Sequence, residues 1–345
     1  MRMIGPIAIA AAVLAVMMAL PGCKAPDELE PAGPVEPTLV ERSSLRERAI
    51  ALLEEAALAE DPASRANALE ALSRTPSRAR GLVGRGLIDE NEGVRAVAAT
   101  VVGRARLTEL GPSVRPRLDD PSPFVRASAI YASRRLDAGF DPSGLAPLLL
   151  EHPEWRVRAH AAFLLGELGE PSALPVLRDA YGAPGPRATP AEARLMRLQM
   201  AEAIVKLGDA SPLEGLRAAL YASRPEELEQ TALAVQIIGE VNDRASIGQL
   251  IRLSAYREDG RRMPAEIRLA CAGALAKLGR TEGGFIADEY AQSELDAIRA
   301  QAASVYGQTG RREHLGKLET MLSDGAASVR VAAADGIVRI VSVGG

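Results

Sequence analysis

A short pattern, an apolar residue followed by arginine, recurs down most of the chain. Six copies match it fully, Met196-Arg197 is a seventh, and Leu228-Glu229 is an eighth in which the charge is reversed. Successive copies stand 31, 32, 39, 32, 39, 31 and 31 residues apart. A period of this length predicts a solenoid, in which each unit packs only against its neighbours. The six plain copies are Val94-Arg95, Val125-Arg126, Val157-Arg158, Ile267-Arg268, Ile298-Arg299 and Val329-Arg330.

Each repeat divides into two helical segments joined by a turn. Val157, Ala161 and Leu165 share one helical face, and a shorter amphipathic run precedes each segment of this kind. We therefore predict an all-α fold, a right-handed α-solenoid of about nine hairpins in residues 41–345. With helices 8–10 Å apart, the stack should extend roughly 70–90 Å. The two steps of 39 residues indicate insertions at Gly182–Pro190 and Tyr256–Pro264, which should form loops.

The segment Val157–Gly166 reads Val-Arg-x-x-Ala-Ala-x-x-Leu-Gly and resembles the HEAT repeat. In the short form shared with phycobilin lyases, the resemblance extends over about 300 residues. It implies that the Val-Arg helix lines the concave face of the solenoid and that its arginine stacks against an acidic residue of the preceding turn. His152, in place of an aspartate, and Glu229, in place of an arginine, interrupt this series. The aspartates that stand six residues before their arginine are Asp89, Asp120 and Asp324.

The first 22 residues have the layout of a secretory signal, with Arg2 followed by an apolar run to Leu20. The sequence Leu20-Pro21-Gly22-Cys23 resembles the lipobox of bacterial lipoproteins, which implies a lipid on Cys23. A plain signal peptide and a retained anchor helix are the alternatives. Residues 23–40 are rich in Pro and Glu and should form an extended tether. By the lipoprotein resemblance, Lys24 favours the outer membrane over the inner, with the repeats in the periplasm of a bacterial envelope.

The sequence contains no motif that favours an enzyme over a binding protein. Nucleophile elbows, phosphate loops, His-Glu-x-x-His and Cys-x-x-Cys are all missing, so we predict no catalytic, metal or cofactor site. A net charge of -4 and the lack of a basic stripe argue against a nucleic-acid partner. The resemblance to phycobilin lyases keeps a tetrapyrrole-lyase-like enzyme, or cofactor handler, as an alternative. A self-assembling structural lipoprotein is a third hypothesis.

Aromatic residues, only 3% of the chain, gather in two consecutive repeats. Tyr131 and Phe163 both stand six residues after their repeat start, so we expect both in the concave face, with His160 one turn before Phe163. Grouped exposed aromatics are typical anchors for a protein partner. Core packing between repeats is the alternative. The predicted partner-binding residues are Tyr131, His160, Phe163, Trp155, Arg135 and Glu167.

The last helical segment is unusually apolar for the end of a solenoid, because terminal repeats normally have a polar outer face. It carries Ile337, Val338, Ile340, Val341 and Val343. We therefore hypothesise that this end docks on a second copy or on a partner, with packing inside its own hairpin as the alternative. The function favoured by the whole sequence is a membrane-tethered periplasmic scaffold that binds a protein or peptide along the concave face.

Overall fold

The computed structural model describes residues 38–183, 188–221, 227–258 and 260–342. The chain divides into Met1–Val35, which lies outside the described residues, and the compact unit Glu36–Gly345, which contains everything below. Its elements are α1 (Leu39–Ala56), α2 (Pro62–Leu72), α3 (Pro76–Gly86), α4 (Glu92–Ala105), α5 (Gly111–Val114), α6 (Pro123–Leu136), α7 (Leu145–Leu150), α8 (Trp155–Leu168), α9 (Leu174–Gly182), α10 (Pro190–Lys206), α11 (Leu213–Ala218), α12 (Leu228–Glu240), α13 (Ile247–Ala255), β1 (Arg257–Glu258), β2 (Arg261–Arg262), α14 (Ala265–Lys277), α15 (Gly284–Tyr290), α16 (Asp296–Thr309), α17 (Leu315–Met321) and α18 (Ala327–Ser342).

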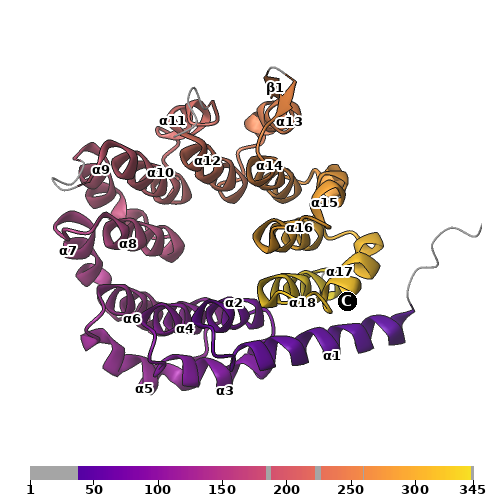
Figure 1. Ribbon diagram of the computed structural model, residues 1–345. Helices are drawn as coiled ribbons and strands as arrows, with labels where there is room; N and C mark the ends of the chain where they lie inside the picture. The colour runs from indigo at the N-terminus through magenta and orange to yellow at the C-terminus, as the bar shows by residue number, and fades with distance from the viewer. Residues whose placement is uncertain (1–37, 184–187, 222–226, 259, 343–345) are drawn as a thin grey trace, which may run out of the picture. The chain divides into compact units, whose positions relative to one another are not determined.

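The helices pair into hairpins and form two layers (Figure 1). The even-numbered helices, which carry the repeat pattern, pack side by side as the inner layer, and the odd-numbered helices cover them on the outside. Among the described residues, the 18 α-helices make nine such pairs. The predicted all-α solenoid of HEAT-like hairpins is therefore confirmed, with the Val-Arg helices on the inner side.

Turn chemistry at the hairpin ends explains where the helices begin and stop. Asn91 caps α4 by accepting hydrogen bonds from the N–H groups of Gly93 and Val94. Gly169 and Gly310 end α8 and α16 with positive φ angles of 73° and 67°, which glycine adopts without strain. The starts of neighbouring inner helices lie side by side, as the contact of Arg95 with Asp120 shows. Their ends lie side by side as well, as the contact of Glu167 with Lys206 shows. The inner helices therefore all run in one direction.

The repeated arginine is a clamp between repeats. Arg95 donates from Nε and Nη2 to the two carboxylate oxygens of Asp120 in the next turn, at 3.0 and 2.9 Å. Its Nη1 donates to the carbonyl oxygen of Asp89 in its own turn, at 2.9 Å. The same arrangement joins Arg65 to Asp89 and Arg299 to Asp324. The carboxylate partner is thus the aspartate of the following repeat, whereas the resemblance had placed it in the preceding turn.

Two interruptions of this clamp have physical explanations. The turn after α7 places His152 where the partner of Arg126 would stand, and Arg126 binds only the carbonyl oxygens of Asp120 and Pro121 within the described structure. In the sequence analysis the second interruption was placed at the wrong residue. Gly239 packs against Ala274 as Gly166 packs against Ala203, so the sixth repeat starts at Gln230 and Thr231 takes the arginine position. The assignment of Glu229 to that position was wrong.

The two ends of the solenoid pack against each other and close the unit into a ring. Helix α18 contacts both α1 and α2, so each inner helix has an inner neighbour on both sides. One hydrophobic core cluster runs across this seam, from Ile50 and Leu53 of α1 to Ile337 and Val338 of α18. The prediction of an open stack 70–90 Å long is therefore wrong, because the first and last hairpins pack against each other and neither end is free.

The seam also corrects the hypothesis of a C-terminal docking face. Ile337, Val338 and Ile340 are at most 2% exposed, and Val341 packs against the same core cluster. The apolar end does dock, but on the first hairpin of its own chain, which leaves no basis for a second copy there. Val343 lies outside the described residues.

The two insertions differ from each other. The second forms a short hairpin in which Arg257 pairs with Arg262, so the expected loop is wrong there. In the first, Pro184–Arg187 lie outside the described residues, and Thr189 caps α10 with Glu192 in a capping box.

Candidate functional site

Tyr131 lies in the core and does not face the concave surface, so its predicted position was wrong. Its side chain is 1% exposed and sits between α4 and α6. A Cβ atom at Gly103 would come within 2.6 Å of the Tyr131 ring, which shows that this glycine makes the room for it. Burial raises the pKa of its hydroxyl above the ordinary value. Tyr131 therefore cannot act as an exposed anchor.

Phe163 and His160 lie together on the inner side of α8, as predicted. The two half-buried rings stack with centroids 6.4 Å apart, and the ring of Phe124 lies tilted against the imidazole at a centroid distance of 5.6 Å. His160 Nε2 lies 3.0 Å from the Ser128 hydroxyl. Burial lowers the pKa of His160 to about 4, which outweighs the raising effect of a hydrogen bond with the backbone of Phe124. A neutral imidazole with no carboxylate partner is suited to packing and hydrogen bonding, and not to acid–base chemistry.

The other predicted site residues are not brought together. Trp155 begins α8 with the guanidinium of Arg156 5.1 Å from its ring, whereas Glu167 is near the far end of the same helix. Twelve residues of helix, at 1.5 Å each, separate the two by roughly 18 Å. Glu167 instead contacts Lys206 at 2.8 Å and Arg104 at 3.7 Å. Arg135 is half-buried, and its Nε has no hydrogen-bond partner among the described residues.

A groove of about 370 Å³ on the inner side crosses α8, α10, α12, α14 and α16. We call this the inner groove. Most of its lining residues stand at the third, sixth, seventh or tenth position after a repeat start, so the repeat itself builds it. The lining includes Phe163, Gln199, Glu202, Leu233, Gln236, Ile237, Glu240, Leu269, Ala270, Gly273, Ala274, Lys277, Gln301, Ser304, Val305 and Gln308.

Side-chain amides are the most distinctive groups of the inner groove. Gln199, Gln236 and Gln308 line it from three different helices, and within the described structure none of their amides has a hydrogen-bond partner. Gly273 leaves the room that Gln308 fills, since a Cβ there would meet Oε1 of Gln308 at 2.3 Å. Each amide offers both a donor and an acceptor. These residues, which stand at the third, sixth and tenth positions of their repeats, were not singled out in the sequence analysis.

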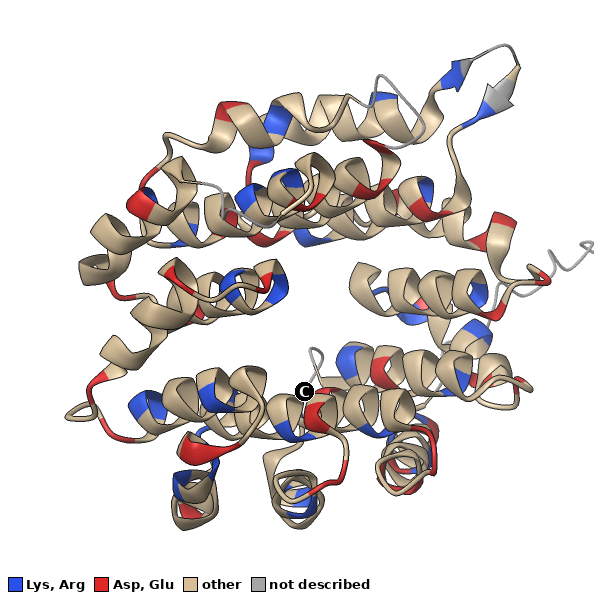
Figure 2. Ribbon diagram, turned by 60° about the vertical axis from the view of Figure 1, so that its left-hand side comes forward, with Lys and Arg blue, Asp and Glu red and all other residues tan. Residues whose placement is uncertain are grey.

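Charged residues at the groove are held in pairs. Figure 2 shows that positive and negative residues are interspersed over the helices of the described body. Lys206 Nζ lies 2.6 Å from Glu202 and 5.4 Å from the Phe163 ring centroid. Burial raises the pKa of Glu202, and this effect outweighs the opposing one of Lys206. Lys277 pairs with Glu240 one repeat further on. Within the described chain, no three His, Cys, Asp or Glu side chains come together as a metal site would require.

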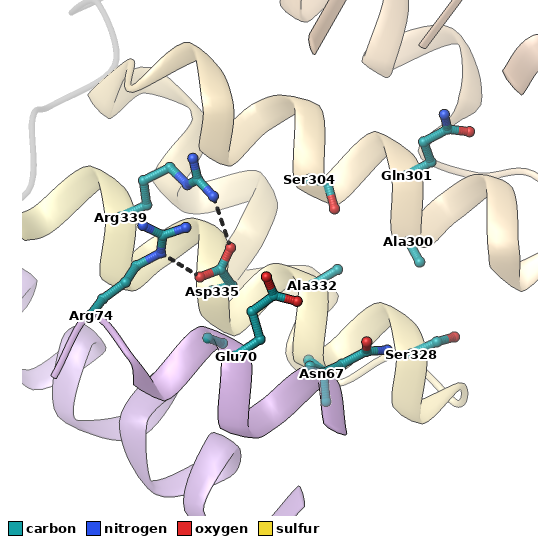
Figure 3. A pocket seen from close by; sticks show the side chains of 12 residues that line it. Asn67, Glu70, Arg74, Ala300, Gln301, Ser304, Ser328, Ala332, Asp335 and Arg339 are labelled. Carbon is teal, nitrogen blue, oxygen red and sulfur yellow. Dashed lines mark hydrogen bonds and ion pairs between the residues drawn. The ribbon is translucent and has the colours of Figure 1, made fainter. Parts of the chain in front are cut away.

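A second pocket, the seam pocket, lies where the two chain ends meet (Figure 3). It has a volume of about 350 Å³ and shares Gln301 and Ser304 with the inner groove. Asp335 of α18 accepts from Arg74 Nε at 2.9 Å and from Arg339 Nη2 at 3.3 Å. The remaining lining residues are Asn67, Glu70, Ala71, Ala300, Ser328, Val331 and Ala332.

Comparison with protein families agrees with the repeat assignment. Residues 142–235 match the family of HEAT repeats. The described body is a solenoid of HEAT-like repeats. A solved complex of CpcE and CpcF of phycocyanin lyase from Nostoc sp. PCC7120 is 18% identical over 83% of this chain and 98% of that chain, with a TM-score of 0.40. Kap121p is 12% identical over 80% of this chain and 39% of its own, with a TM-score of 0.32.

No curated protein matches the sequence. In the described part of the HEAT-like solenoid, no helix combines the length and the apolar character needed to cross a membrane. Cys23, the predicted lipid attachment site, lies outside the described residues.

Proposed function

We propose that this protein is a lipid-anchored scaffold of the bacterial envelope whose inner groove binds an extended polypeptide segment of a partner. The anchor is the Cys23 thiol, and the preference for the periplasmic side and the outer membrane follows from the lipobox-like leader and Lys24. The proposal adds no enzymatic step, because the paired charges and the neutral His160 of the inner side supply no nucleophile–base arrangement.

The observation that supports a polypeptide ligand is the row of unpartnered amides over an apolar floor. Gln199, Gln236 and Gln308 can each donate to a carbonyl oxygen and accept from an N–H group, which are the two groups that an extended backbone presents. Leu233 and Phe163 are half-buried beside them and offer contacts for side chains. A groove with amides on several successive repeats suits a ligand that is itself a repeating polymer.

The experiment is photo-crosslinking in intact cells. A photoreactive amino acid at position 236, in the groove, should give a discrete product, and the same residue at position 292, in an exposed turn outside both pockets, should not. The partner segment joined to position 236 is then identified by mass spectrometry and synthesised.

Direct binding of that synthetic segment completes the test. Gln236→Ala with Gln308→Ala should weaken binding about tenfold, since two neutral hydrogen bonds contribute about 0.5–1.5 kcal/mol each. Gln292→Ala is the matched control and should leave binding unchanged. Equal crosslinking at both positions, or a purified protein that carries visible colour from a bound tetrapyrrole, would contradict the proposal.

A further inference from the structure

The seam pocket contains two arginines that share a single carboxylate. Arg74 donates one N–H to Asp335 and Arg339 donates one, which leaves four of the five donors of each guanidinium uncommitted within the described structure. The side chains of Arg74 and Arg339 are 38% and 30% exposed, so these donors are accessible from the pocket. Figure 3 shows both guanidinium groups beside Asp335 at one end of the hollow.

The two arginines outnumber the carboxylate that they share. Asp335 accepts a hydrogen bond from both Arg74 and Arg339, so the pair of guanidinium groups carries one positive charge more than this carboxylate. Glu70 also lines the pocket, but its carboxylate pairs with Arg104, which lies near Glu167 as well. Guanidinium groups with free, forked donors are the usual partners of carboxylates in proteins.

Neutral groups in the rest of the pocket fit a peptide that carries such a carboxylate. The hydroxyls of Ser304 and Ser328 and the amide of Asn67 have no hydrogen-bond partner among the described residues. Ala71 and Ala332 provide a shallow apolar floor. Because Gln301 and Ser304 belong to both pockets, a chain lying in the inner groove continues into the seam pocket without leaving the inner surface.

We propose that the seam pocket binds the carboxylate of an acidic side chain of the partner segment between Arg74 and Arg339. This inference rests on the proposed peptide-binding function and specifies it: the segment is acidic at the point where it crosses the seam. Since Arg74 lies in the turn that follows α2 and Arg339 lies in α18, the bound carboxylate joins the two ends of the solenoid. Binding and ring closure then stabilise each other.

The test selects a random peptide library against the full chain and follows the acidic residues of the selected pool. The control target is the Arg178→Gln variant, which loses an ion pair between Arg178 of the outer helix α9 and Asp209; the pool selected on it should be enriched in aspartate and glutamate. The pool selected on the Arg339→Gln variant should lack this enrichment. Arg339→Gln leaves the Arg74–Asp335 contact across the seam in place. For one selected peptide, replacing its acidic residue by the amide should weaken binding about tenfold, the effect of losing a charge-assisted hydrogen bond.

Asp335→Asn separates a binding role from a structural one. If the two arginines bind a ligand carboxylate, removing their internal competitor strengthens peptide binding several-fold, whereas Arg74→Gln weakens it. If the cluster only holds the seam together, both variants weaken binding or leave it unchanged, and the inference is overturned. Hydrogen exchange in α18 should slow when the peptide is bound, and unchanged exchange at saturation would contradict bridging of the seam.

The outcomes also separate this inference from the function on which it rests. Selection of peptides without acidic enrichment, bound equally by the Arg339→Gln chain, overturns the carboxylate site and leaves the groove intact. Selection of no peptide at all overturns both.

Discussion

Arg48 in the first helix donates from Nη1 to Oε1 of Glu319, which stands 271 residues later in the chain, at 2.8 Å. The two residues are about half exposed, so the pair itself adds little stability. Its significance is geometric. A contact between the first and penultimate helices exists only because the repeats curve through a full circle and bring α1 onto α18.

The first prediction concerns the stability of the seam. Val338→Asp should lower the free energy of unfolding by several kcal/mol, because it places an unpaired carboxylate in the core cluster shared by both ends. Ile88→Asp, at a position 72% exposed, is the control and should change stability little. Urea unfolding checks both, and scattering of the native chain should give the dimensions of a closed body. An elongated scattering profile for the native chain would contradict closure.

The clamp between repeats gives a second prediction. Asp120→Ala should destabilise the fold by about 2 kcal/mol, because it leaves the largely buried guanidinium of Arg95 without its bidentate partner. Glu90→Ala, one residue after the neighbouring clamp aspartate and 89% exposed, is the matched control. Denaturant midpoints measure the difference. Equal midpoints for the two variants would mean that the clamp contributes nothing.

Two glycines in helices should respond to alanine with opposite signs. A Cβ at Gly307 would come within 2.5 Å of Gly336 Cα, so Gly307→Ala forces α16 and α18 apart and should cost about 1–3 kcal/mol. Gly316 in α17 has nothing within 4 Å of such a Cβ, and Gly316→Ala should stabilise by about 0.5–1 kcal/mol. Thermal unfolding of the two variants tests the sign.

A pH dependence follows from His160. Its pKa is about 4 in the fold, because burial disfavours the charged imidazolium, against an ordinary value of 6.5. The unfolded state therefore takes up a proton first as the pH falls, and the stability that neutral His160 contributes is full above about 6.5 and lost progressively towards about 4. His160→Phe should flatten the stability profile in this window. NMR titration of the imidazole gives its pKa directly, and a midpoint near 6.5 would contradict the buried placement.

The leader supplies the last prediction. Cys23→Ala should abolish lipid attachment, seen by mass spectrometry of the mature chain, and release the protein from membranes after a carbonate wash. Cys271→Ala is the control, because Cys271 is buried, its pKa is raised to about 12 by burial, and its thiol is not a candidate for acylation. Retention of the Cys23→Ala chain in the membrane would identify the apolar run as an anchor helix.

The sequence was sufficient for the hairpins because each repeat carries its own signal. The prediction from the sequence failed where the position of a side chain depends on a neighbouring repeat. Tyr131 occupies the same repeat position as Phe163, yet Gly103 on the neighbouring helix admits the tyrosine ring into the core. Gln230-Thr231 lacks the apolar-Arg signature, so its register became visible only through the contact of Gly239 with Ala274.

Ring closure could not be derived from the pattern at all. It depends on the sum of small rotations between successive repeats, and an error of a few degrees in each would leave the ends far apart. The charge pairs that identify the seam, Arg48 with Glu319 and Arg74 with Asp335, are exposed or half-exposed residues with no periodic signature. Of the inner-groove amides, Gln199 and Gln308 were predictable in principle, because they belong to repeats whose starts the pattern gives; Gln236 lies in the repeat whose register the sequence did not show.

The common direction of the inner helices makes the two rims of the ring electrically unlike. Partial positive charge from the helix N-termini collects on one rim, and partial negative charge from the C-termini collects on the other. Lys206 and Lys277 stand in the last turns of α10 and α14, where they complement the negative rim. A polypeptide also has a head and a tail. The same segment bound in its two possible directions would therefore differ in binding free energy, so the ring can select one direction of the bound chain.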